Sequence, residues 1–158
     1  MPDPNPNISQ VEVNNTTYDI CDAVARDNMS SEHQYDIDWT PLPLTDAVAY
    51  GETSAPIYAR YGKIVQVCGA AKPKVAQTAG ATITIGNLPE HYRPYNNVTL
   101  LNQGSSQDQW CFTIIGTRSL ETSEWGDLQC ARYQAGGTLK AYGTTTWLPF
   151  STAFIAAD

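Results

Sequence analysis

The chain has 158 residues, of which 42% are hydrophobic and 16% charged, with 10 prolines and 11 glycines. These totals suit one main domain built of short strands and many turns. The net charge of −7 and the scattered lysines and arginines disfavour nucleic-acid binding, which needs clustered positive charge. No segment approaches the roughly 18–20 consecutive apolar residues of a membrane helix, so membrane insertion is not expected.

The first forty residues predict an arm, a hairpin and one short helix. Residues 1–8 alternate proline with aspartate and asparagine, and they contain neither the basic nor the apolar region of a signal peptide. Two alternating runs joined by Asn14-Asn15 predict a β-hairpin. Apolar side chains then recur at helical spacing and predict a helix over about 20–30. This helix is too short to be stable alone and needs a partner, either the main domain or copies of itself. Its candidate contact residues are Tyr18, Cys21, Ala25 and Met29.

Two prolines in TPLPL, after Trp39, indicate an extended linker, so we place a domain boundary near residue 40. Residues 1–39 are then the arm, hairpin and helix, with Trp39 expected to anchor the following domain to the helix. Residues 40–158 form the β-structured domain.

Strand patterns follow one another from residue 56 to the end, with no second helical pattern. The first is a hairpin that turns at Gly62-Lys63. Such a series predicts a mostly β fold, an antiparallel barrel or sandwich of jelly-roll-like type. The inward-facing residues are expected to be Val65, Val67, Ala81, Ile83, Ile85, Val98, Leu100, Trp110, Phe112, Ile114, Leu128, Cys130, Leu139, Ala141, Leu148, Phe150 and Phe154.

The stretch NLPEHYRPYNN (residues 87–97) combines potential acid–base side chains with two prolines. Pro89 and Pro94 each remove a backbone donor, so the stretch is expected to connect two strands. Neighbouring side chains on an extended loop diverge, which disfavours general acid–base catalysis. Tyr92 is expected to cover one end of the barrel and Arg93 to pair locally.

Recognisable catalytic and metal-binding motifs are missing from the sequence. His33 and His91 lack further ligands at zinc-binding spacing, and neither a nucleophile elbow nor a phosphate-binding glycine loop is present. The four cysteines have no paired spacing and are interpreted as free, mostly buried thiols. No cofactor or metal is expected, and the chain is not expected to be an enzyme.

Acidic and aromatic residues meet in RSLETSEWGDLQ (residues 118–129). The simplest interpretation is a solvated hairpin tip that turns at Gly126. The second is a saccharide contact, in which Trp125 stacks on a sugar ring. The third is sugar hydrolysis by two of Glu121, Glu124 and Asp127. The candidate saccharide-binding residues are Trp125, Glu124, Asp127, Asp108 and Arg118, whereas Trp110 and Trp147 are expected in the core or an interface.

Five segments in order resemble tail-fibre and receptor-binding proteins of tailed bacteriophages and prophages. They are VNNTTYDICDAVARD, TPLPLTDAVAYG, ARYGKIVQVCGAA, AGATITIGNLPEHYRP and TWLPFSTAFI, and the resemblance covers most of residues 8–158. In similar sequences the turn commonly has glycine where this chain has His91. If that position needs a positive φ, histidine is placed there at some cost.

The resemblance implies a cofactor-free homotrimer at the virion tail tip, made in the host bacterial cytoplasm, whose head adheres to a host-surface saccharide. The N-terminal segment would join other tail or baseplate proteins. Three copies of the short helix packing around one axis would bury its apolar stripe. A glycan-cleaving tail enzyme and a structural tail or capsid-decoration protein remain the alternatives.

Overall fold

A computed structural model describes residues 10–13, 16–19, 38–104 and 108–158. The chain divides into two units, Met1–Asp36 and Ile37–Asp158, which are described separately. In the first unit, β1 (Gln10–Val13) and β2 (Thr16–Asp19) pair antiparallel with Val13 opposite Thr16, which confirms the predicted hairpin. The predicted helix, with Cys21, Ala25 and Met29, lies outside the described residues, as do the side-chain contacts of Tyr18.

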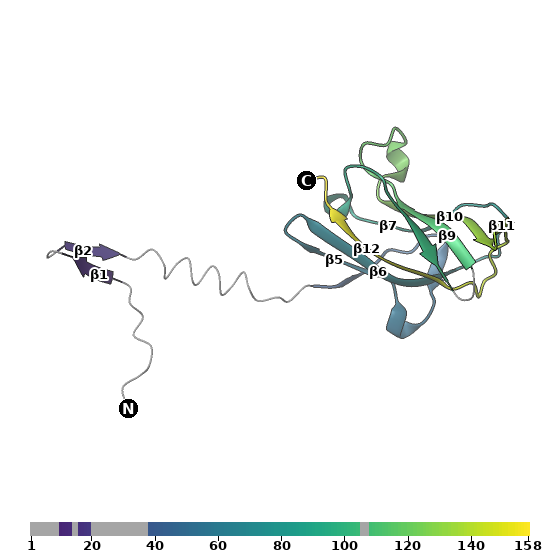
Figure 1. Cartoon of the computed structure of the whole chain (residues 1–158), viewed down its shortest axis with the longest axis horizontal. Coiled ribbons are helices and arrows are strands. Elements are labelled where there is room, and N and C mark those ends of the chain that lie inside the picture. Colours follow the sequence, from purple (N-terminus) through teal and green to yellow (C-terminus); the bar gives the residue numbers. More distant parts are fainter. Residues whose placement is uncertain (1–9, 14–15, 20–37, 105–107) are drawn as a thin grey trace, which may run out of the picture. The chain divides into compact units, whose positions relative to one another are not determined.

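The second unit, here called the β domain, contains two five-stranded antiparallel sheets, drawn in Figure 1. The β6 sheet is built around the ten-residue strand β6 (Ile64–Pro73). It pairs on one side with β12 (Leu148–Ile155) and on the other with β5 (Ile57–Tyr61) and then β4 (Ala47–Ala49). The short strand β3 (Thr40–Pro41) pairs with β5, so the predicted linker is extended but belongs to the sheet.

The β10 sheet repeats this plan around β10 (Asp127–Ala135). One side of β10 pairs with β9 (Asp108–Ile114), which pairs in turn with β8 (Val98–Gln103). The other side pairs with β7 (Ile83–Asn87) and then β11 (Thr138–Leu139). Three short 3-10 segments, η1 (Glu52–Ser54), η2 (Glu90–Tyr92) and η3 (Thr122–Glu124), lie in connections, and the described residues contain no α-helix.

The sheets curl into a half-barrel whose rims touch at several places. Asn102 in β8 donates a 3.3 Å hydrogen bond from Nδ2 to the carbonyl oxygen of Pro149 in β12. Near β7, the Thr45 amide donates to the Ile85 carbonyl at 3.0 Å. Pro94 and Ala156 form an isolated bridge at another rim. The prediction of a mostly β antiparallel sandwich is therefore confirmed.

The core lies between the two sheets and consists of the inward side chains of alternating strand positions. Phe112 from the β10 sheet stacks on Phe150 from the β6 sheet, with ring centroids 5.0 Å apart and planes 14° apart. Burial confirms most of the expected inward positions. Fully buried are Val65, Val67, Ile85, Trp110, Phe112, Ile114, Leu128, Cys130 and Leu148.

The prediction for TLKAY is wrong, because Leu139 is 49% exposed and Ala141 is also exposed. The chain pairs with β10 for only two residues and then crosses to a bridge between Gln77 and Tyr142. Leaving the ladder resets which side chain faces inward, and the fully buried residue is Tyr142.

A β-bulge in β10 also changes the alternation. The register with β9 shifts between Ala131 and Gln134, and Arg132 is the one non-glycine residue with positive φ (54°) in the described chain. The extra residue turns Arg132 outward and returns Tyr133 to the core.

The hairpin between β5 and β6 turns at Gly62-Lys63 as predicted, with Tyr61 opposite Ile64. Gly62 takes a φ of 57°, which the absence of a Cβ permits. The alternation of the two strands and the glycine in the turn thus both favour a hairpin at this position.

Candidate functional site

A shallow hollow of about 330 Å³ opens where two connections of the β domain meet, lined by Asn96, Asn97, Arg118 and Ser119. Residues 93–97 join η2 to β8, and residues 115–126 join β9 to β10. The lining side chains supply two amides, a guanidinium and a hydroxyl, so the hollow offers several hydrogen-bond donors and acceptors within a small volume.

Backbone hydrogen bonds hold the two connections together. The amide of Thr117 donates to the Pro94 carbonyl at 2.9 Å, and the amide of Arg118 donates to the Tyr95 carbonyl at 3.0 Å. The Gly116 amide donates to Asn97 Oδ1 at 2.8 Å. The walls of the hollow are therefore preorganised by main-chain geometry.

Close approach at this junction requires glycine. A Cβ built on Gly116 would lie 2.4 Å from the carbonyl carbon of Asn96 and 2.7 Å from the Tyr95 oxygen. Real Cβ atoms do not approach backbone atoms so closely, so a side chain at this position would separate the two connections.

An aromatic ring and a cation stand beside the hollow. Tyr95 is 55% exposed, and the Arg118 guanidinium carbon lies 5.9 Å from its ring centroid. This cation–π contact holds the Arg118 side chain over the ring. A partly exposed aromatic surface therefore adjoins the polar lining.

Trp125 is hydrogen-bonded to one of the residues that line the hollow. Its indole Nε1–H donates to the Ser119 carbonyl at 2.9 Å, and the side chain is half-buried. Asn87 Nδ2 donates both to the Trp125 carbonyl at 3.0 Å and to Asp127 Oδ1 at 2.7 Å. Trp125 thus positions Ser119, while Asp127 is engaged by an amide at the start of β10.

The five saccharide-binding residues expected from the sequence do not form one cluster. Arg118 lines the hollow, and Trp125 donates to the carbonyl of the lining residue Ser119. Glu124 accepts a 3.3 Å hydrogen bond from Gln129 Nε2. Asp108 begins β9, whereas the connection with Arg118 follows the far end of that strand, so Asp108 lies at the other end of the β10 sheet.

At that other end, Asp108 forms a polar group with Tyr133 and Lys140. The Tyr133 hydroxyl donates to Asp108 Oδ2 at 2.6 Å, and Lys140 Nζ lies 3.4 Å from Oδ1. Burial, followed by the hydrogen bond to Asp108, raises the pKa of Tyr133 to about 12. Tyr133 therefore stays protonated as a donor at neutral pH.

Tyr95, Asn96 and Asn97 are the last three residues of the stretch NLPEHYRPYNN, and they were not predicted as site residues from the sequence. The stretch is a connection between strands, as predicted. Tyr92 packs edge-to-face on Tyr58 with centroids 4.7 Å apart, and Arg93 Nε donates to the nearby Leu88 carbonyl at 2.9 Å. The sequence signal for this side of the hollow is an aromatic residue followed by two amide residues directly after Pro94.

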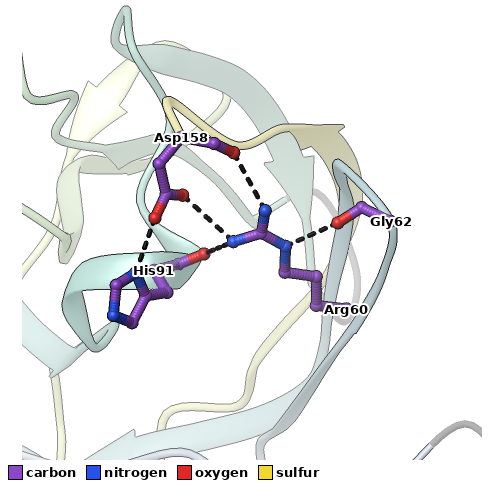
Figure 2. A network of polar contacts seen from close by, with 4 residues as sticks. All are labelled: Arg60, Gly62, His91 and Asp158. Atoms are coloured by element: carbon purple, nitrogen blue, oxygen red, sulfur yellow. Dashed lines mark hydrogen bonds and ion pairs between the residues drawn. The ribbon is translucent and has the colours of Figure 1, made fainter.

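His91 does not take a positive φ and so does not strain the turn. Its exposed imidazole joins the network in Figure 2, where Nδ1 lies 2.6 Å from Asp158 Oδ2. The Arg60 guanidinium contacts Asp158 Oδ1 at 3.0 Å and donates to the Asp158 carbonyl at 2.9 Å and to the His91 carbonyl. These contacts tie Asp158 to η2 and β5.

This network predicts a dependence of stability on acidic pH. The hydrogen bond with His91, then that with Arg60, lowers the pKa of Asp158. The pKa of Asp158 is lower in the folded state than its unfolded value of about 3.9, so the carboxylate stabilises the fold at pH values above about 3.9. This stabilisation is lost as the pH falls through the pKa of the folded state. We expect wild type to have a higher Tm than Asp158→Asn at pH 6, and the difference to shrink below about pH 4.

Thermal melts between pH 3 and 7 measure this effect. Asp38→Asn, which removes an exposed carboxylate with no described partner, is the matched control. A difference in Tm between wild type and Asp158→Asn that stays constant over this range would contradict the prediction.

The cysteines of the β domain are free thiols in the structure. Burial raises the pKa of Cys130 to about 12, and its Sγ lies 3.7 Å from the Tyr142 hydroxyl in the core. A thiol held protonated in this way is a poor nucleophile.

The described part of the chain holds neither a metal-binding cluster nor a membrane-spanning helix. No group of three or more histidine, cysteine and acidic side chains is arranged to hold a metal ion there. No helix within the same residues is long and apolar enough to cross a membrane.

Comparisons with known proteins identify no family for this chain. No protein-family model matches it, and no curated protein or solved structure is significantly similar to it.

Proposed function

We propose that this chain is a non-catalytic receptor-binding protein at the tail tip of a bacteriophage, whose β domain is the head that binds a host-surface saccharide. The observation that carries the proposal is the hollow beside Tyr95, with its amide, guanidinium and hydroxyl lining. Sugar hydroxyls act as both donors and acceptors, and the apolar face of a pyranose packs on aromatic rings. The five segments that resemble phage receptor-binding proteins support the same class.

The distribution of charge supports contact with a bacterial surface. Residues 38–158 carry nine acidic and eight basic side chains, a net charge of −1, whereas residues 1–37 carry seven acidic and one basic, a net charge of −6. The head is therefore nearly neutral and can approach an anionic surface without strong repulsion. The acidity lies in the segment proposed to join other tail or baseplate proteins.

The proposal includes a homotrimer with heads oriented alike. A shallow hollow binds one saccharide weakly, but three linked heads make the second and third contacts intramolecular and raise the avidity. Light scattering on the full chain measures the assembly. A monomer that binds no bacterial cells or wall glycans would overturn the proposed function.

Binding is tested with Arg118→Ala and Tyr95→Ala on an array of bacterial surface polysaccharides. Arg118→Ala removes a charge-assisted donor, and Tyr95→Ala removes the aromatic surface. Each substitution is expected to weaken monovalent binding roughly tenfold, the equivalent of about 1.4 kcal/mol. Lys63→Ala, which removes an exposed cation from the β5–β6 turn, is the matched control and should bind like wild type. Equal binding by all three variants would show that the hollow is not the site.

The same samples distinguish adhesion from catalysis. Reducing-sugar release from the bound polysaccharide is measured for wild type and Glu124→Gln. We expect no release from either protein. Release by wild type that Glu124→Gln abolishes would replace adhesion with glycan cleavage.

A further inference from the structure

A pair of exposed aromatic rings lies on the outer face of the β6 sheet, away from the hollow. Tyr50 and Trp147 are 43% and 38% exposed, and their ring centroids are 6.4 Å apart with planes inclined at 57°. Trp147 was expected in the core or in an interface. Two large rings that stay exposed while touching each other form a preorganised apolar surface.

The two rings reach this surface from opposite sides of β6. Tyr50 directly follows β4, and its amide donates to the Ala70 carbonyl at 2.9 Å. Trp147 directly precedes Leu148, which pairs with Ala71. Ala70 lies between the two flanking strands, because it pairs with Pro149 in β12 on its other side. Sheet hydrogen bonding thus fixes the position of both aromatic residues.

A cation borders the pair. Lys72 pairs with Val48 across the β4–β6 ladder, and its Nζ lies 5.9 Å from the Tyr50 ring centroid. It forms no ion pair with any described residue. The ammonium group is therefore a donor with hydrogen bonds to spare beside the two rings.

We propose that Tyr50, Trp147 and Lys72 form a second saccharide-binding site, on which a pyranose stacks on the rings while Lys72 donates to its hydroxyl groups. Three side chains match the size of a single sugar, whereas a stable protein interface needs about 800 Å² per partner. The inference shares the ligand class of the proposed function but uses no residue of the hollow. Occupation of two sites by one branched or repeating polysaccharide would add avidity within each head.

The test uses the full chain and a panel of soluble hexoses, N-acetylhexosamines and deoxyhexoses, with saturation-transfer NMR and titration calorimetry. Trp147→Ala and Tyr50→Ala are each expected to weaken binding at this site roughly three- to tenfold, the energy of one aromatic contact. Trp147→Phe should retain part of the affinity. Val75→Ala, which truncates another exposed apolar side chain, is the matched control and should leave binding unchanged.

The two proposals fail separately. Tyr95→Ala should leave binding at Tyr50 and Trp147 intact, and Trp147→Ala should leave binding at the hollow intact. The proposal of a second site is overturned if Trp147→Ala weakens the binding of none of the sugars in the panel. It is equally overturned if Trp147→Ala leaves sugar binding unchanged and alters the mass in light scattering, since the rings would then contact another chain. Thermal melts confirm that each variant is folded.

Discussion

Replacing Gly116 by alanine is expected to abolish saccharide binding at the hollow and to lower the free energy of unfolding by about 1–3 kcal/mol. The new Cβ would lie 2.4 Å from the carbonyl carbon of Asn96, and backbone there has little freedom to move. Separating the connections would break the bonds from Thr117 to Pro94 and from Arg118 to Tyr95. The hollow would then lose both its shape and the position of its guanidinium.

Urea unfolding and polysaccharide binding measure the two effects. Gly143→Ala is the matched control, because a Cβ at that position would have its nearest neighbour, Thr146 Oγ1, at 3.7 Å. The control should change neither quantity. Full binding by Gly116→Ala would mean that the junction does not shape the site.

Phe112→Ala is expected to have the largest effect on folding. The ring is fully buried and stacks on Phe150 across the two sheets, so its removal leaves a cavity at the centre of the domain. Phe→Ala substitutions in cores lower the free energy of unfolding by about 3–5 kcal/mol. Because domains of this size are stable by only about 5–15 kcal/mol, the variant should be marginally folded at 37 °C.

Equilibrium denaturation, monitored by tryptophan fluorescence, measures the change in the free energy of unfolding. Thr113→Ala is the matched control. Thr113 follows Phe112 in β9 and faces outward, and its hydroxyl makes a 3.2 Å contact with that of Thr99. Its effect should stay within about 0.5 kcal/mol, as for ordinary surface substitutions. Similar values for the two variants would contradict the placement of Phe112 at the centre of the core.

The proposed function rests on adhesion without chemistry, and the surroundings of the acidic residues agree with that proposal. Asp127 accepts from Asn87, Glu124 accepts from Gln129, and Asp108 is engaged by Tyr133 and Lys140. Each of these three carboxylates accepts a hydrogen bond from a neighbour in its own part of the fold. The hollow itself is lined by amides, a guanidinium and a hydroxyl, which can exchange hydrogen bonds with sugar hydroxyls as the proposal requires.

Strand alternation in the sequence was enough to predict the mostly β fold, the two hairpins and most of the core. A pleated strand turns successive side chains to opposite faces, so a period of two is visible in any strand with one buried face. Ile83 and Ile85 in β7 and Phe112 and Ile114 in β9 follow this rule. The prolines that bracket EHYR likewise predicted a connection, because proline removes ladder donors wherever it stands.

The site depended on tertiary structure. Tyr95 and Arg118 are far apart in the sequence, and they meet because backbone hydrogen bonds and the missing side chain of Gly116 draw two connections together. The bulge at Arg132 and the crossing of the chain to Tyr142 are similar cases, since each changes the facing of later residues through pairing with another strand. Local periodicity reports the environment of one strand at a time. Contacts between distant segments are decided by how the sheets close around the core, and at those contacts the hollow and the Tyr50–Trp147 pair arise.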